Sequence, residues 1–186
     1  MKTLLRPLRL CGLALTLLAM TAPAIPQQAA AQQTAGRYTV EIVVFRAEGD
    51  NSGEDGAAAA PLRSTLGDIV TTPVTTRRLA GAASKLRSAG GYRILAHTAW
   101  SQAPAAWNSR RGVSIEQLGV NAPGLSGNVV LERGQFVHLG LDLKVEDGGR
   151  SFVLAELRQV KLDEALYFDH PQLGVIALVT RSAATP

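Results

Sequence analysis

The sequence predicts a single α+β domain with a mainly antiparallel sheet and one or two helices packed on one face. Alternating apolar residues indicate strands over residues 38–45, 92–100 and 136–145. One stretch, residues 79–89, instead has apolar residues at helical spacing. An Asp-Gly-Gly turn at 147–149 is typical of a hairpin, which favours antiparallel pairing.

The N-terminus has the features of a secretory signal peptide over residues 1–31. Three basic residues precede an apolar run at 10–20, and an Ala-Ala-Ala cleavage sequence follows at 29–31. Cleavage after Ala24 also fits. The apolar run is too short to span a membrane, and no later stretch is long enough, so we expect no integral membrane segment in the mature protein.

Removal of this segment changes the charge and the cysteine content. The full chain has 19 Lys and Arg residues against 15 Asp and Glu, and three of the 19 lie in the signal peptide, which leaves 16 against 15. A nearly neutral chain gives no electrostatic case for a nucleic-acid partner. The single cysteine, Cys11, leaves with the signal peptide, so the mature chain has neither a disulfide nor a thiol nucleophile.

The mature chain is long enough for one domain with one core. We expect a short polar leader at 32–36, the domain at 37–181 and a tail at 182–186. Residues 47–61 are rich in Gly, Asp and Ala and predict a mobile loop. The acidic residues at 50–55 raise the alternative of a calcium loop, but their spacing misses the EF-hand pattern.

The helix at 79–89 is amphipathic and is followed by Gly90 and Gly91, which predict its end. Its basic residues are typical of a solvated face, and contact with a glycan or an acidic lipid is the alternative. The next strand, Tyr92 to Trp100, leads into a connector in which Trp107 lies close to two arginines.

The C-terminal half has the clearest strand pattern. The residues of 136–145 alternate so that one face is core, and the turn leads into a strand at 152–162. Residues 128–133 predict a further strand, and 173–180 predict the last one. The predicted core residues of the strand at 136–145 are Val137, Leu139, Leu141, Leu143 and Val145.

A polar corner, Asp169-His170-Pro171, lies between aromatic residues and the apolar last strand. It places a possible anion or metal partner beside a carboxylate and a rigid proline. A capped turn, in which Asp169 binds backbone amides, is the structural alternative.

Four blocks of the sequence resemble the CsiV family of periplasmic peptidoglycan-binding proteins. They are Tyr167 to Val175, Tyr92 to Gln102, the segment from Leu125 through Phe136 to Leu143, and Tyr38 to Phe45. The resemblance implies a periplasmic protein that binds peptidoglycan. It also implies support of a bifunctional peptidoglycan synthase together with its outer-membrane lipoprotein activator. The family's basic run before the corner is matched only in part, at Arg158, Lys161, Glu164 and Tyr167.

A glycan strand needs aromatic faces for its apolar sugar surfaces and charge-assisted donors for its carboxylates. On this basis the candidate ligand-binding residues are Tyr92, Arg93, His97, Trp100, Trp107, Arg110, His138, Arg158, Tyr167, Asp169 and His170. Strict alternation along one strand predicts that Tyr92 and Trp100 share a face opposite Arg93 and His97. A core position for both aromatic residues is the alternative.

Catalytic and metal sites have weaker support. The three histidines lie in separate blocks without zinc spacing, and no Gly-x-Ser-x-Gly sequence occurs. No pair of carboxylates stands out as an acid and base for glycan cleavage. We therefore predict a non-enzymatic protein without metal or cofactor. The alternatives are an envelope module that recognises another protein through an edge strand, and a cell-wall hydrolase.

Overall fold

The computed structural model describes residues 36–48 and 62–182. The predicted signal peptide, nearly all of the leader, most of the predicted mobile loop and most of the tail lie outside these residues. No helix of the described part is long and apolar enough to cross a membrane.

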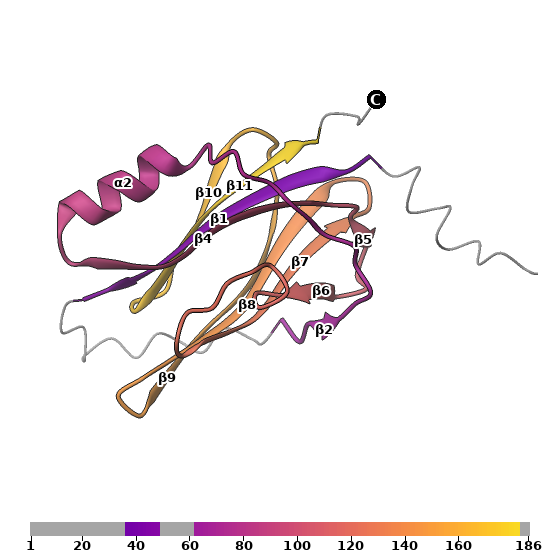
Figure 1. Ribbon diagram of the computed structural model, residues 1–186. Helices are drawn as coiled ribbons and strands as arrows, with labels where there is room; N and C mark the ends of the chain where they lie inside the picture. Colours follow the sequence, from indigo (N-terminus) through magenta and orange to yellow (C-terminus); the bar gives the residue numbers. More distant parts are fainter. Residues whose placement is uncertain (1–35, 49–61, 183–186) are drawn as a thin grey trace, which may run out of the picture.

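Two β-sheets build the domain (Figure 1). Sheet A has the strand order β10-β11-β1-β4-β3, and all its pairings are antiparallel. Its strands are β10 (Ala165–Phe168), β11 (Leu173–Arg181), β1 (Tyr38–Ala47), β4 (Tyr92–Gln102) and β3 (Thr72–Pro73). Sheet B has the order β2-β6-β7-β8-β9, and β5 pairs with β7. Its strands are β2 (Thr65–Leu66), β5 (Ala105–Ala106), β6 (Arg111–Ser114), β7 (Leu125–Arg133), β8 (Val137–Asp147) and β9 (Arg150–Gln159).

The described residues contain one α-helix, α2 (Ala80–Ala89), so the fold is broadly α+β but mainly β. The prediction of one main sheet is wrong in this respect, because the strands divide between two sheets. Alternation along a strand shows that one face is buried but does not show whether a helix or a second sheet covers it.

The main core lies between the two sheets. Leu139, Leu141 and Leu143 of β8 are fully buried there, as their alternation predicts, in one cluster with Val40 and Ile42 of β1. Because side chains of both sheets belong to this cluster, the domain is a sandwich with a shared interior.

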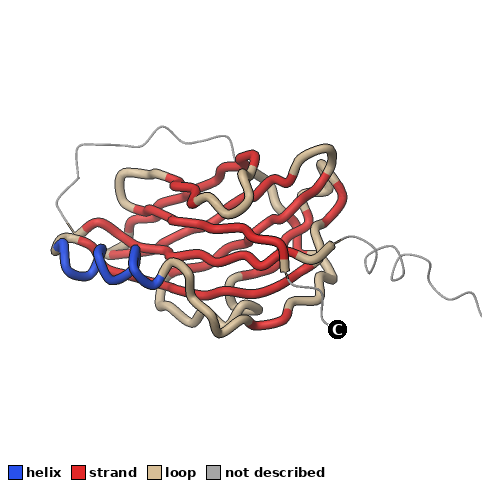
Figure 2. Tube along the Cα trace, turned by 90° about the horizontal axis from the view of Figure 1, so that it is seen from above, coloured by secondary structure: helices blue, strands red, loops and turns tan. Residues whose placement is uncertain are grey.

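Helix α2 covers the outer face of sheet A (Figures 1 and 2). Ala83 of the helix packs with Val43 of β1 and Leu178 of β11 in a second, smaller cluster. Strand β1 is therefore buried on both faces, which explains why its sequence is apolar at most positions.

The N-terminus of α2 has no local side-chain cap. The carboxylate of Glu41 on β1 takes this role, because it accepts hydrogen bonds from the backbone N–H groups of Arg78 (2.7 Å) and Leu79 (3.0 Å). The helix ends at Gly90, whose φ of 68° is in the left-handed region. The sequence predicts the end of the helix, but it does not predict the cap, because Glu41 is distant from the helix in the sequence.

A β-bulge in β4 changes which side chains share a face. Val44 pairs with Ala96 and Phe45 with Ile94, so Leu95 is the extra residue. Trp100 consequently points into the core between the sheets, while Tyr92 packs against Phe45 on the outer face of sheet A. The prediction that Tyr92 and Trp100 share a face is wrong, because one inserted residue reverses the alternation.

Several short strands lie in segments for which the sequence predicts no strand. Strands β2, β3, β5 and β6 have only two to four residues each. The strand predicted at 152–162 ends at Gln159, and β10 begins at Ala165 before the polar corner. Such short pairings depend on neighbours far away in the sequence, so local periodicity does not indicate them.

Candidate functional site

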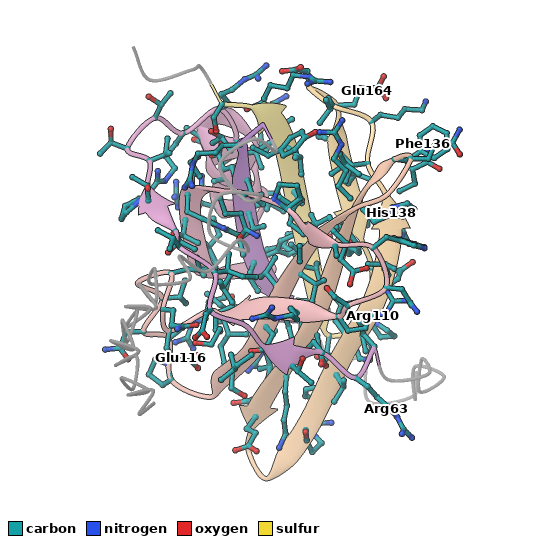
Figure 3. The ribbon with its side chains drawn as sticks, turned by 90° about the vertical axis from the view of Figure 1, so that its right-hand side faces the viewer. Arg63, Arg110, Glu116, Phe136, His138 and Glu164 are labelled. Atoms are coloured by element: carbon teal, nitrogen blue, oxygen red, sulfur yellow. The ribbon has the colours of Figure 1, made fainter. Side chains whose placement is uncertain are left out.

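An exposed aromatic surface lies where the β5–β6 connection meets the β7–β8 hairpin. The side chain of Trp107 is 49% exposed, and its ring centroid lies 4.3 Å from that of His138 on β8, with an angle of 43° between the planes. The guanidinium of Arg110 lies 5.8 Å from the Trp107 ring centroid, within cation–π range. We call Trp107, Arg110 and His138 the Trp107 platform. Figure 3 shows Arg110 and His138 on the flank of the molecule that also bears Phe136.

A buried carboxylate holds this loop in place. Glu132 of β7 is completely buried, and its carboxylate accepts hydrogen bonds from the backbone N–H groups of Asn108 (3.2 Å) and Arg110. It also pairs with the Arg110 guanidinium at 3.1 Å. These bonds hold Asn108 (φ 63°) and Arg110 (φ 55°) in the left-handed conformation, which is costly for residues with a side chain. The loop around Trp107 is thus preorganised.

Two further details support the Trp107 platform as a binding surface. A Cβ atom at Gly134 would lie 3.2 Å from the Trp107 Cβ and Cγ atoms, so a glycine here lets the indole pack closely on the hairpin. His138 Nδ1 is buried and has no hydrogen-bond partner among the described residues. Unsatisfied buried nitrogens are uncommon, and their partner is often a water or a ligand.

A second aromatic group lies on the outer face of sheet A. The Phe45 ring meets Tyr92 edge-on at 5.6 Å and stacks on Tyr167 at 6.2 Å. The Tyr167 hydroxyl donates to Asp169 Oδ1 at 2.9 Å. Burial, and then the hydrogen bond to Asp169, raises the pKa of Tyr167 to about 12. Tyr167 is therefore neutral at physiological pH, and it orients Asp169.

Arg158 joins β9 to β10. Its guanidinium donates to the Tyr167 carbonyl at 2.6 Å, pairs with Glu156 at 2.5 Å and lies over the Phe168 ring at 5.1 Å. Arg158 therefore mainly connects β9 with β10 inside the domain.

The histidine of the polar corner lies beside β9. The His170 ring is 6.2 Å from the Phe152 ring, and its Nδ1 accepts a hydrogen bond from the Gln172 N–H at 3.3 Å. Burial lowers the pKa of His170, and the neighbouring Asp169 carboxylate opposes the shift. The corner is a turn in which His170 makes the side chain-to-backbone bond, and the Asp169 carboxylate is exposed.

The candidates on β4 have different environments. His97 Nε2 lies 2.7 Å from Glu41 Oε1 on the outer face, under the start of α2. Trp100 is buried and donates its indole N–H to Gln102 at 2.6 Å. Arg93 is exposed at the other end of the strand. His97 and Trp100 also line a cavity of about 480 Å³ at the edge of β4.

The eleven predicted site residues thus do not form one site. Trp107, Arg110 and His138 come together, and so do Tyr92, Tyr167 and Asp169, but on different sheets. In the described part of the chain no three His, Cys, Asp or Glu side chains are grouped to hold a metal ion.

Sequence reasoning missed Glu132, Glu41 and Phe45. The available signal was an acidic residue inside an apolar strand, as in Val129-Val130-Leu131-Glu132, because a buried carboxylate requires a set of donors. Phe45 lies on the first predicted strand, but its aromatic partners come from β4 and β10.

The fold and these surfaces define a small mainly-β domain that presents aromatic rings beside arginines. Residues 67–182 match the family model described as "Peptidoglycan-binding protein, CsiV". This match covers more than half of the chain, and the protein belongs to the CsiV family. Comparisons with curated protein sequences and with solved structures give no significant match.

Proposed function

We propose that this protein binds peptidoglycan and that the glycan strand stacks on the Trp107 platform. The observation that carries the proposal is the half-exposed indole of Trp107, fixed between His138 and Arg110 by the buried Glu132. A rigid, exposed aromatic face suits the apolar face of a sugar ring and loses little conformational entropy on binding.

The charges around the platform suit an anionic glycan. Arg110 has five N–H donors, and its bond to Glu132 uses one of them. Arg111 and Arg133 are exposed, and Arg133 pairs in register with Ala106, next to Trp107. The stem peptides carry carboxylates, as does muramic acid where no stem peptide is attached, and arginine is the favoured partner for such groups.

The resemblance to the CsiV family implies a wider role. We propose that the mature protein, residues 32–186, acts in the periplasm without catalysis. We also propose that it supports cell-wall synthesis through a peptidoglycan synthase and its outer-membrane lipoprotein activator. The family description as a peptidoglycan-binding protein supports the binding part of this role.

The test is co-sedimentation of the mature protein with purified sacculi at low and at physiological salt. Trp107→Ala should lower retention about tenfold, equivalent to about 1.4 kcal/mol. The matched control is Tyr92→Ala, which removes an exposed aromatic side chain from the other sheet and should leave retention unchanged. Equal retention of wild type and Trp107→Ala would refute the platform as the site. Absence of wild-type retention at physiological salt would refute the function.

A further inference from the structure

A groove runs along one edge of β4, and none of its lining residues belongs to the Trp107 platform. Its volume is about 480 Å³, and consecutive β4 residues from Leu95 to Trp100 line it. The opposite wall is the turn that follows β6, including Gln117 and Asn121. Backbone hydrogen bonds within this turn, such as Val120 N–H to the Ile115 carbonyl at 3.1 Å, make the wall well defined.

The edge of β4 in this groove has no strand partner within the described residues. Strand β3 pairs only with Trp100 and Ser101, and the Val74 N–H extends the ladder to the Ala99 carbonyl at 2.9 Å. The Val74 carbonyl accepts a hydrogen bond from the Arg77 guanidinium. In an antiparallel ladder every second residue presents both its N–H and its C=O to the same side. His97 therefore presents its backbone groups in the same direction as Ala99, into the groove.

The bulge at Leu95 limits the length of the free edge. A bulge disrupts regular pairing and the Ala99 carbonyl is already bound by Val74, so the free segment is about three residues, Ala96 to Thr98, or about 10 Å of strand. Within it, His97 is the residue whose backbone groups face the groove. A strand added to this edge of β4 would lie in line with β3. The occupant is therefore a short extended segment and not a whole strand of a second sheet.

The charge of the groove favours one kind of ligand over another. Arg77 is the one permanent charge among its lining residues, which include no carboxylate, and no described carboxylate forms an ion pair with Arg77. A second copy of this chain, paired through the same edge, would bring a second Arg77 into the interface without a counter-charge. An acidic side chain of a different protein would supply one.

A stem peptide of peptidoglycan fits the edge less well. Its D-residues and its γ-linked glutamate interrupt the two-residue alternation that pairing with an L-strand requires. We propose that this groove binds an extended, acidic L-peptide segment of a partner protein by β-strand addition to β4 next to β3. The proposal concerns a different surface from the glycan site and does not rest on glycan binding.

The test is selection of random 12-residue L-peptides displayed on phage against the mature protein. Enriched peptides should be rich in β-forming residues and contain Asp or Glu. Synthetic copies methylated on alternate backbone nitrogens should bind at least tenfold more weakly, because N-methylation removes the ladder donors.

Two variants locate the site. Asn121→Trp fills the groove from its exposed wall and should weaken binding of the selected peptides at least tenfold. Glu116→Trp places the same side chain on the same turn outside the groove lining and should bind as wild type. Arg77→Gln should reduce the preference for acidic peptides.

Three results would overturn the proposal. These are no enrichment over an unrelated protein of similar charge, equal binding to Asn121→Trp, or displacement of the selected peptides by soluble stem peptide at lower concentration than by the peptides themselves. Sacculus retention of Asn121→Trp should equal that of wild type, so failure here is distinguishable from failure of the glycan proposal.

Discussion

Neutralising the buried carboxylate under the Trp107 platform should both destabilise the fold and weaken glycan binding. In Glu132→Gln, one carboxylate oxygen becomes an NH₂ group, which then faces donors instead of accepting from them. The affected donors are the backbone N–H groups of Asn108 and Arg110, the Arg110 guanidinium and, at 3.5 Å, the Ser109 hydroxyl. The substitution keeps the size of the side chain, so the change is electrostatic.

The expected cost follows from burial and from the number of bonds. A hydrogen bond to a charged group contributes about 1.5–3 kcal/mol, and breaking a fully buried ion pair costs about 3–5 kcal/mol. The Arg110 side chain is 29% exposed and can regain water, which reduces the loss. We therefore expect the free energy of unfolding to fall by about 2–3 kcal/mol.

Urea unfolding followed by tryptophan fluorescence measures this loss. In a Trp107→Phe background the signal reports on the buried Trp100 alone. Glu116→Gln, at an exposed position, is the matched control and should change stability by less than about 0.5 kcal/mol. Glu132→Gln should also reduce sacculus retention at a temperature where it remains folded. A loss below about 1 kcal/mol with unchanged retention would refute the anchoring role of Glu132.

Three further predictions concern packing and pH. A Cβ atom at Gly174 would lie 2.4 Å from the Phe45 ring, so Gly174→Ala should cost about 1–3 kcal/mol in urea unfolding, and an unchanged midpoint would contradict this. Gly81→Ala in α2 meets no atom within 4 Å and should instead stabilise by about 0.5–1 kcal/mol in the same assay. Burial lowers the pKa of His170 below its ordinary 6.5, so the unfolded state binds more protons and folding stability falls as pH drops through 6.5. The decrease in melting temperature between pH 7 and pH 5 should therefore be smaller in His170→Gln; an equal decrease would exclude this contribution.

The sequence by itself determined the long elements. The alternation of Val137, Leu139 and Leu141 identified β8 and its core face, and helical spacing with two glycines identified α2 and its end. Family membership was also accessible from the sequence, because linear motifs carry it. These features are local, since each depends on neighbours within one or two turns or along one strand.

Only the tertiary structure decided which aromatic residues are available for binding. Trp100 and Trp107 lie seven residues apart, yet one is buried between the sheets and the other is half exposed. The bulge at Leu95 places Tyr92 on the same face as Phe45 and Tyr167. Strict alternation of residues does not predict this bulge.

The burial of two carboxylates also depends on the tertiary structure. Glu41 and Glu132 are stable inside the protein because backbone N–H groups from other elements converge on them. That convergence depends on how the two sheets and the helix pack, which is a non-local property that the local sequence pattern does not encode.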